Sequence, residues 1–418
     1  MAELTKKRGR PAGSANKPKL KGNLEVVKFE KHNEGSPITH NSQQGWVNWG
    51  LKNDYPQSLL NLFNESPTHR ASIGFEVQSI VGGGIDYDAM KIDKTQIVPN
   101  YAYSWDYFIR SLALDYSIYG SYAFQIILNK DRTTYSFWHV PMEKVRVSPY
   151  DEDGQITSFW ISNDWSAIGL NPPVELPAFD MREDSKITYG QPYMYVYQPY
   201  SPTMEYYTSP QYAAGIKAIQ SEIEFVEYDL KHIVNGFSSA GVLTLPQTET
   251  DEQRKAIINS IQQMFQGASN SNQIAITFRT NVEDKPIEWT PFTNNGGNVD
   301  MYNGSNQRCI SRILAAHQIP SPMLIGMPDS NNSGFSSDAD KIETAYQLYE
   351  RLTGNYHRQC VIQTVNQMFR MNGVDVELII KPLRFNDFGG EDDKSDETKG
   401  SDVEQDTSTD NINEKVEE

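Results

Sequence analysis

The stretch "SPQYAAGIKAIQSEIEFVEYDLKHIVNGF", residues 209–237, decides how this chain is organised. Its apolar positions follow one another at steps of four and three residues, which places them along one side of an α-helix. Ser209 and Pro210 suit the start of that helix, and about 27 residues at about 1.5 Å each make a rod roughly 40 Å long. The predicted packing seam of the rod is Tyr212, Ile216, Ile219, Ile223, Val226, Leu230, Ile233 and Phe237. Glu222 and the other acids fall mostly off this seam, so the rod needs apolar neighbours.

A small β-α-β unit is predicted directly after the rod, within residues 241–298. "GVLTL" at 241–245 and "QIAITF" at 273–278 have the composition of strands. Between them, a Thr-x-x-Gln capping box from Thr250 to Gln253 opens a helix that ends at Gln266, before Gly267. A second helix is predicted over residues 299–318.

The segment that follows, residues 319–337, is predicted to be a mobile loop. Pro320, Pro322 and Pro328 exclude a continuous helix, and the Ser/Asn/Gly run after them has the composition of a loop. Helix returns over residues 338–372 and stops at Asn372-Gly373. Its predicted faces are Ile342, Ala345, Tyr349, Leu352 and Tyr356, then Val361, Val365 and Phe369. A last strand over residues 374–385 closes the ordered part, so the order is rod, α/β insert, helix, loop and long helix.

The region before the rod, residues 23–208, is predicted to be an α+β domain. Ser66 and Ser104 suit helix N-caps, and Gly82 and Gly120 suit the helix ends that follow. Four aromatic and β-branched segments then predict strands joined by the turns "NKDR" and "DEDG". The last third of this region, rich in Pro and Tyr, is expected to be irregular.

Charge is unevenly distributed along a chain with a formal net charge of −17. Residues 1–22 carry seven bases against Glu3, while residues 389–418 carry twelve acids against three lysines and are expected to be disordered. Arg8-Gly9-Arg10-Pro11 matches the core of an AT-hook, which lies in the narrow minor groove of A·T-rich DNA. Lys6, Lys7, Arg8 and Arg10 are therefore a candidate DNA-contacting arm. The alternative is a solvated arm without a specific ligand.

The composition is that of a globular protein: 418 residues, of which 38% are hydrophobic and 11% aromatic. No apolar run follows the basic start and none reaches the ~18 residues that span a bilayer, so a cytoplasmic protein without a membrane contact is expected. Cys309 and Cys360 each lie in a helical pattern and are interpreted as reduced core thiols.

No constellation of catalytic residues is found in the sequence. Gly82-Gly83-Gly84 lacks the spacing of a dinucleotide fingerprint, and no P-loop or G-x-S-x-G nucleophile motif occurs. The seven histidines show no metal-ligand spacing. The expectation is therefore a protein with no cofactor, no metal and no enzymatic activity, in which the histidines have packing or surface roles.

Several segments, in this order and spacing, resemble the portal proteins of tailed bacteriophages. They are "NDYPQSLL" at 53–60, "SPTH" at 66–69, "VNGFSSAGVLTL" at 234–245, "MFQGASNSNQ" at 264–273 and "ISRILAAHQIPSPMLIG" at 310–326. The resemblance spans roughly residues 50–385. It departs from the family at the C-terminal end, where an acidic tail replaces the longer helical crown that portals often have.

The resemblance implies an α+β, portal-like fold with eight segments. These are a basic arm (1–22), a wing (23–208), a stem helix (209–240), a clip insert (241–298), a second stem helix (299–318), a tunnel-loop region (319–337), a tunnel and crown helix with a closing strand (338–388) and an acidic tail (389–418). The tunnel loop would face DNA through Met327, Asp329, Ser330, Asn331, Asn332, Ser333 and Ser336.

The function implied by the resemblance is a homo-oligomeric ring, dodecameric in the family, at one capsid vertex of the virion. Double-stranded DNA would pass through its channel during packaging and ejection. The implied partners are the large subunit of the terminase, the major capsid protein and scaffold, and a head-tail adaptor, with assembly in the host cytoplasm. An acidic body suits such a sleeve, because each Lys or Arg paired with a phosphate would resist sliding.

Two other classes of function remain open at the level of sequence. One is a DNA-binding scaffold protein that uses the AT-hook and dimerises through its body. The other is a nuclease or protease fused to the basic arm. A closed ring, a dimer or metal-dependent DNA cleavage would distinguish the three.

Overall fold

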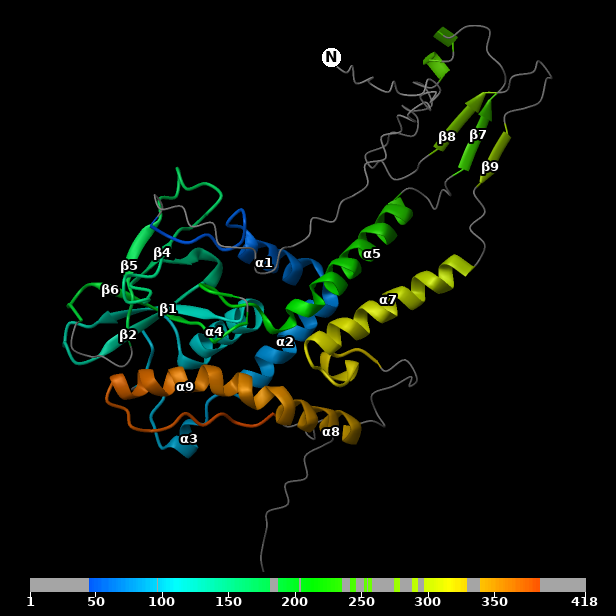
Figure 1. Cartoon of the computed structure of the whole chain (residues 1–418). Coiled ribbons are helices and arrows are strands. Elements are labelled where there is room, and N and C mark those ends of the chain that lie inside the picture. Colours follow the sequence, from blue (N-terminus) through cyan, green and yellow to red (C-terminus); the bar gives the residue numbers. More distant parts are fainter. Residues whose placement is uncertain are drawn as a thin grey trace, which may run out of the picture.

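The computed structural model describes residues 45–95, 97–180, 187–202, 204–234, 241–245, 252–253, 255–257, 274–278, 288–291, 297–328 and 339–383. A body of packed helices and sheets carries two long helices, α5 (Ile216–Val234) and α7 (Gly297–Ala316), which run side by side away from it (Figure 1). Small antiparallel sheets combined with helices make this an α+β fold, as the sequence predicts.

The first four helices that the structure describes are α1 (Tyr55–Glu65), α2 (Pro67–Val81), α3 (Tyr87–Met90) and α4 (Trp105–Tyr119). Helices α2 and α4 begin and end where the sequence places their signals, whereas α3 is not predicted. The Ser66 and Ser104 hydroxyls accept the backbone N–H groups of His69 and Tyr107, so both residues cap their helices as predicted. Gly120 ends α4 in the left-handed conformation, with φ of 73°.

Two three-stranded sheets follow α4. The first has the order β2-β1-β6, from β1 (Tyr122–Leu128), β2 (Tyr135–Val140) and β6 (Pro192–Tyr197), and the second has the order β3-β4-β5, from β3 (Val145–Val147), β4 (Ser158–Ile161) and β5 (Val174–Pro177). A 3-10 helix, Met142–Lys144, joins them. The expectation that the last third of residues 23–208 is irregular is wrong, because β5 and β6 lie there. Pro192 occupies the first position of an edge strand, where a missing N–H is tolerated.

The core of the body is aromatic. Trp105 of α4 packs edge-on against Phe369 at 4.9 Å between ring centroids, and against Phe108 at 5.6 Å. Phe124 and Phe137 extend the same cluster from β1 and β2, and both are fully buried. Helix α9 (Asn355–Met371) supplies Phe369, so the C-terminal part of the chain completes the core that the N-terminal part begins.

The predicted rod is realised in two parts. A 3-10 helix, Gln211–Gly215, leads into α5, so Tyr212 precedes the α-helix instead of lying within it. Beyond α5, strand β7 (Gly241–Leu245) pairs in parallel with β8 (Ile274–Phe278) and antiparallel with β9 (Glu288–Pro291). The parallel pair fits the predicted β-α-β unit, whereas β9 is not predicted. The predicted helix from Thr250 to Gln266 lies largely outside the described residues.

The long C-terminal helix is interrupted by a π-turn. It consists of α8 (Ala339–Tyr349), a π-turn over Glu350–Gly354, and α9. Tyr349 is fully buried, but Leu352 and Tyr356, which the sequence places on the same helix face, are 65% and 56% exposed. The prediction of one shared face is wrong, because the wider π-turn moves the buried positions to Thr353, Gly354 and His357.

The predicted closing strand, residues 374–385, is also wrong within residues 374–383, which the structure describes. Only an isolated bridge forms there, between Ile380 and Ile85. The segment runs along residues 83–86 through three backbone hydrogen bonds, such as Lys381 N–H to Gly84 O at 2.9 Å. Its partner is a glycine turn and not a strand, so no ladder propagates.

Candidate functional site

The predicted packing seam becomes progressively exposed along α5. Tyr212, Ile216 and Ile219 are buried, and Ile223 is half-buried. The next two seam positions, Val226 and Leu230, are 49% and 59% exposed. We call Val226 and Leu230 the distal stripe. Ile233 lies in α5, but its side chain, like all of Phe237, falls outside the described residues.

We call residues 211–234, the 3-10 helix and α5 together, the stem. The root of the stem is held tightly against α7 and the body. A Cβ atom on Gly215 would come within 2.5 Å of the Cβ of Ala316, so only glycine permits this approach. The Tyr212 hydroxyl donates to the carbonyl oxygen of Ile118 at 2.8 Å, and the Tyr212 ring stacks on His317 at 5.1 Å. The stem therefore starts from a fixed base, whereas its distal stripe lies open.

A buried carboxylate joins α5 to the start of α2. Glu222 is buried and accepts hydrogen bonds from the hydroxyls of Ser66 and Thr68, at the N-terminal end of α2. A helix N-terminus favours a negative charge, which supports the carboxylate there. The sequence placed Glu222 off the seam and gave no reason to expect it inside.

A chain of three titratable side chains lies one turn further along α2. His317 Nδ1 is 2.7 Å from Glu76 Oε1, and His317 Nε2 is 2.9 Å from His69 Nδ1. His69 is fully buried, and Glu76 and His317 are 5% and 3% exposed. We call Glu76, His317 and His69 the joint chain. It ties the end of α7 to two turns of α2. His69 and His317 therefore form hydrogen bonds between these helices in addition to packing against their neighbours.

Burial governs the charge of two histidines in this region, His69 and His357. It lowers the pKa of His69 to about 2, with the neighbouring His317 as a second cause. Burial also lowers the pKa of His357, whose Nε2 lies 2.6 Å from the side-chain oxygen of Gln211. The folded protein thus holds both rings neutral.

The end of α7 is also fastened to the π-turn. Gln318 follows His317, and its side-chain oxygen accepts the hydroxyl of Thr353 at 2.6 Å. In the same turn Glu350 accepts the Ser79 hydroxyl at 2.6 Å and pairs with Arg358 at 2.8 Å. Helix α2 is therefore linked through polar side chains to both the stem and the long C-terminal helix.

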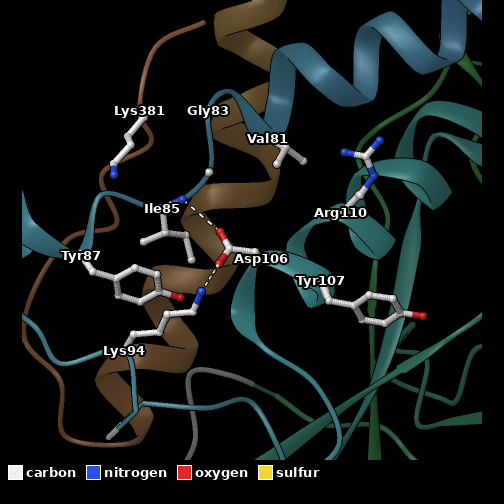
Figure 2. A pocket seen from close by; sticks show the side chains of 10 residues that line it. Val81, Gly83, Ile85, Tyr87, Lys94, Asp106, Tyr107, Arg110 and Lys381 are labelled. Atoms are coloured by element: carbon white, nitrogen blue, oxygen red, sulfur yellow. Dashed lines mark hydrogen bonds and ion pairs between the residues drawn. The ribbon is translucent and has the colours of Figure 1, made fainter.

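A recess of about 510 Å³ opens between α2, α4 and the segment around Lys381 (Figure 2). Asp106 lies within it and accepts the Ile85 N–H at 3.0 Å, while Lys94 Nζ is 3.7 Å away. Burial, then Asp106, raises the pKa of Tyr87 to about 12. Arg110 and Lys381 also line the recess. Its lining offers cations that could attract an anion, but no pairing of a nucleophile with a base.

The other predicted site residues fall largely outside the described part of the chain. Of the proposed tunnel loop only Met327 is described, after a 3-10 helix over Pro322–Ile325. Asp329, Ser330, Asn331, Asn332, Ser333 and Ser336 lie outside it, as do Lys6, Lys7, Arg8 and Arg10. Cys309 and Cys360 are buried free thiols, as predicted.

The described residues contain no group of three His, Cys, Asp or Glu side chains suited to a metal ion. Likewise, none of their helices is both long and apolar enough to cross a membrane.

Comparison with known proteins gives a likeness in fold. The sequence matches no protein-family model and no curated protein. Among solved structures, a chain in the neck of a native gene transfer agent particle, computed with C12 symmetry, is similar with a TM-score of 0.51. The two chains are 16% identical, over 80% of this chain and 84% of that one.

Two related structures show the same likeness. A chain from the virion of the native gene transfer agent particle has a TM-score of 0.50 and 16% identity, over 78% of this chain and 83% of that one. A chain from the neck of the empty particle, computed with C6 symmetry, has the same score and identity over 78% and 84%. This chain therefore shares its fold with a component of these particles.

Proposed function

We propose that this chain is a portal-type subunit that assembles into a closed ring at the neck of a phage-like virion. The observation that carries the proposal is the seam of α5, buried at its root and open at the distal stripe. A folded monomer leaves Val226 and Leu230 half exposed, and a neighbouring copy in a ring would cover them. The likeness in fold to a chain of a C12 neck supports the same arrangement.

In this proposal the ring is a conduit for double-stranded DNA and not an enzyme. The energy for packaging would come from the terminase, whose large subunit docks on the ring. The major capsid protein, scaffold and a head-tail adaptor would be the other partners, with assembly in the host cytoplasm. Residues 327–337 would touch DNA lightly as a tunnel loop, and the recess at Asp106 has no assigned role here.

Native mass spectrometry with negative-stain imaging tests the ring directly. The purified chain should form closed rings at micromolar concentration, and dodecamers are expected. Leu230→Asp places a charge on the distal stripe and should shift the population to smaller species, because burying an unpaired charge is unfavourable. Leu170→Asp is the matched control, since Leu170 is 86% exposed on the body. A parent chain that stays monomeric would contradict the proposal, and a dimer would favour the AT-hook scaffold instead.

A further inference from the structure

The joint chain has no access to a substrate. None of its three residues lines the recess at Asp106, and all three side chains are buried where the end of α7 meets α2. What such a chain can exchange with its surroundings is a proton, because imidazole and carboxylate groups both titrate.

When both histidine rings are neutral, the hydrogen bonds determine which nitrogen of each ring carries a proton. The Glu76 carboxylate accepts the His317 Nδ1–H, so His317 Nε2 carries a lone pair and must accept the His69 Nδ1–H. His69 Nε2 is then an unprotonated acceptor. It is buried, with no hydrogen-bond partner among the described residues.

One added proton preserves both hydrogen bonds. A protonated His317 donates from Nδ1 to Glu76 and from Nε2 to His69 Nδ1, which becomes the acceptor. His69 then carries its proton on Nε2. The charge of His317 balances that of Glu76, so the three side chains together are neutral inside the protein.

A second proton cannot be accommodated in the same geometry. His69 and His317 would then both present N–H groups across the 2.9 Å contact, and two donors repel. We propose that the joint chain is a proton-dependent lock between the end of α7 and α2, which stays closed with one added proton and opens when His69 takes up another.

Several titratable or charged groups face the chain from the surrounding elements. Tyr212 stacks on His317 from the 3-10 helix before α5, and Tyr349 faces Glu76 from α8. His357 of α9 interacts with both Glu76 and His317. Glu222 is engaged by Ser66 and Thr68, and Glu350 by Ser79 and Arg358. Among these titratable groups, the one that His69 contacts by a hydrogen bond is His317.

The sign of the pH dependence follows from the closed state. His69 has a pKa of about 2 when closed and the ordinary value of 6.5 when exposed. The open state therefore binds more protons below pH 6.5, and the closed state loses stability as the pH falls from there. As the pH falls below 6.5, the equilibrium constant for opening should rise by about tenfold for each pH unit, since opening takes up one additional proton.

Hydrogen exchange of the full-length protein, from pH 6.5 to pH 4.5, measures this opening. The reporters are amides at the end of α7, such as His317 N–H bonded to Ile313 O at 3.1 Å and Ile319 N–H bonded to Leu314 O at 2.9 Å. After correction for the intrinsic exchange rate, their protection should fall about fiftyfold across the range, because an exposed His69 is already half protonated at pH 6.5. Amides of β1 and β2 in the same molecule should keep theirs.

Three variants identify the group that takes up the proton. His69→Asn keeps a hydrogen-bonding atom near the position of Nδ1 but does not titrate, so most of the fiftyfold fall should disappear. His139→Gln is the matched control. His139 also contacts a carboxylate, that of Asp115 at 2.9 Å, but it lies on β2 and not in the joint chain. His357→Gln can keep the bond to Gln211 and should retain the fall.

Each of the other results would overturn the proposal. If the fall in protection persists in His69→Asn and vanishes in His357→Gln, the proton is taken up by His357 and not by His69. Loss of protection in β1 and β2 together with α7 would mean global unfolding and not the opening of a joint. Protection independent of pH in the parent would show that there is no proton-dependent lock. None of these results depends on whether the chain forms a ring.

Discussion

The core of the body and the joint between stem and α2 are both buried, but they are built from different chemistry. Trp105, Phe108, Phe124, Phe137 and Phe369 fill the first with rings that contact at 4.9–6.2 Å. Hydrogen-bonded carboxylates, imidazoles and hydroxyls fill the second. Apolar packing is non-directional and tolerates small shifts, whereas a buried hydrogen bond must be made in one geometry or it is costly. The joint therefore fixes the register of the stem, while the core supplies most of the stability.

The largest effect should come from the aromatic core. Trp105→Ala removes a fully buried ring between Phe108 and Phe369 and should lower the free energy of unfolding by about 3–5 kcal/mol. Chemical denaturation measures the loss. Tyr101→Ala, at a residue that is 92% exposed, is the control and should stay within about 0.5 kcal/mol. Equal losses would mean that the aromatic cluster is not the main source of stability.

A smaller effect is expected at the joint. Glu76→Ala leaves the His317 Nδ1–H without its acceptor and should destabilise the fold by about 1–3 kcal/mol. The same denaturation experiment applies, with hydrogen exchange at the end of α7 as a local measure. If Glu76→Ala cost as much as Trp105→Ala, the contrast between a stabilising core and a positioning joint would fail.

The smallest effect should occur on the outer face of the π-turn. Leu352→Ala changes a 65% exposed side chain and should alter the stability of the monomer by no more than about 0.5 kcal/mol. Its buried neighbour gives the comparison, since Tyr349→Ala should cost about 3–5 kcal/mol. Thermal unfolding of both variants checks the register. A large loss at Leu352 in the monomer would mean that the helix is continuous and that the π-turn is absent.

Sequence reasoning succeeds where a structural signal is local. Ser66 and Ser104 cap helices because the hydroxyl and the N–H that it accepts lie three residues apart. The alternating strands β1 to β4 carry their signal in the same way. In β6, by contrast, Pro192 and the surrounding tyrosines resemble a loop, and only pairing with β1 makes them a strand.

The parts that the sequence does not predict depend on distant partners. His69 and His317 are 248 positions apart, and Glu222 meets Ser66 across 156 positions, so no spacing announces either contact. The π-turn has a similar origin. Gly354 lies against Ser79, where a Cβ atom would come within 2.9 Å of the Ser79 hydroxyl oxygen, and Glu350 bonds the same serine. The regular spacing of apolar residues in a helix does not predict these contacts.

The pairing of β7 with β9 also has a practical consequence. Gly241, where the first strand of the insert begins, lies opposite Pro291, where the last one ends. The chain thus enters and leaves this three-stranded unit at neighbouring points, beyond α5 and before α7 (Figure 1). A unit whose two ends adjoin can be exchanged as a cassette, because any replacement with the same end-to-end distance leaves both helices where they are. For protein engineering, residues 241–291 are therefore the natural place to graft a new binding module onto this scaffold.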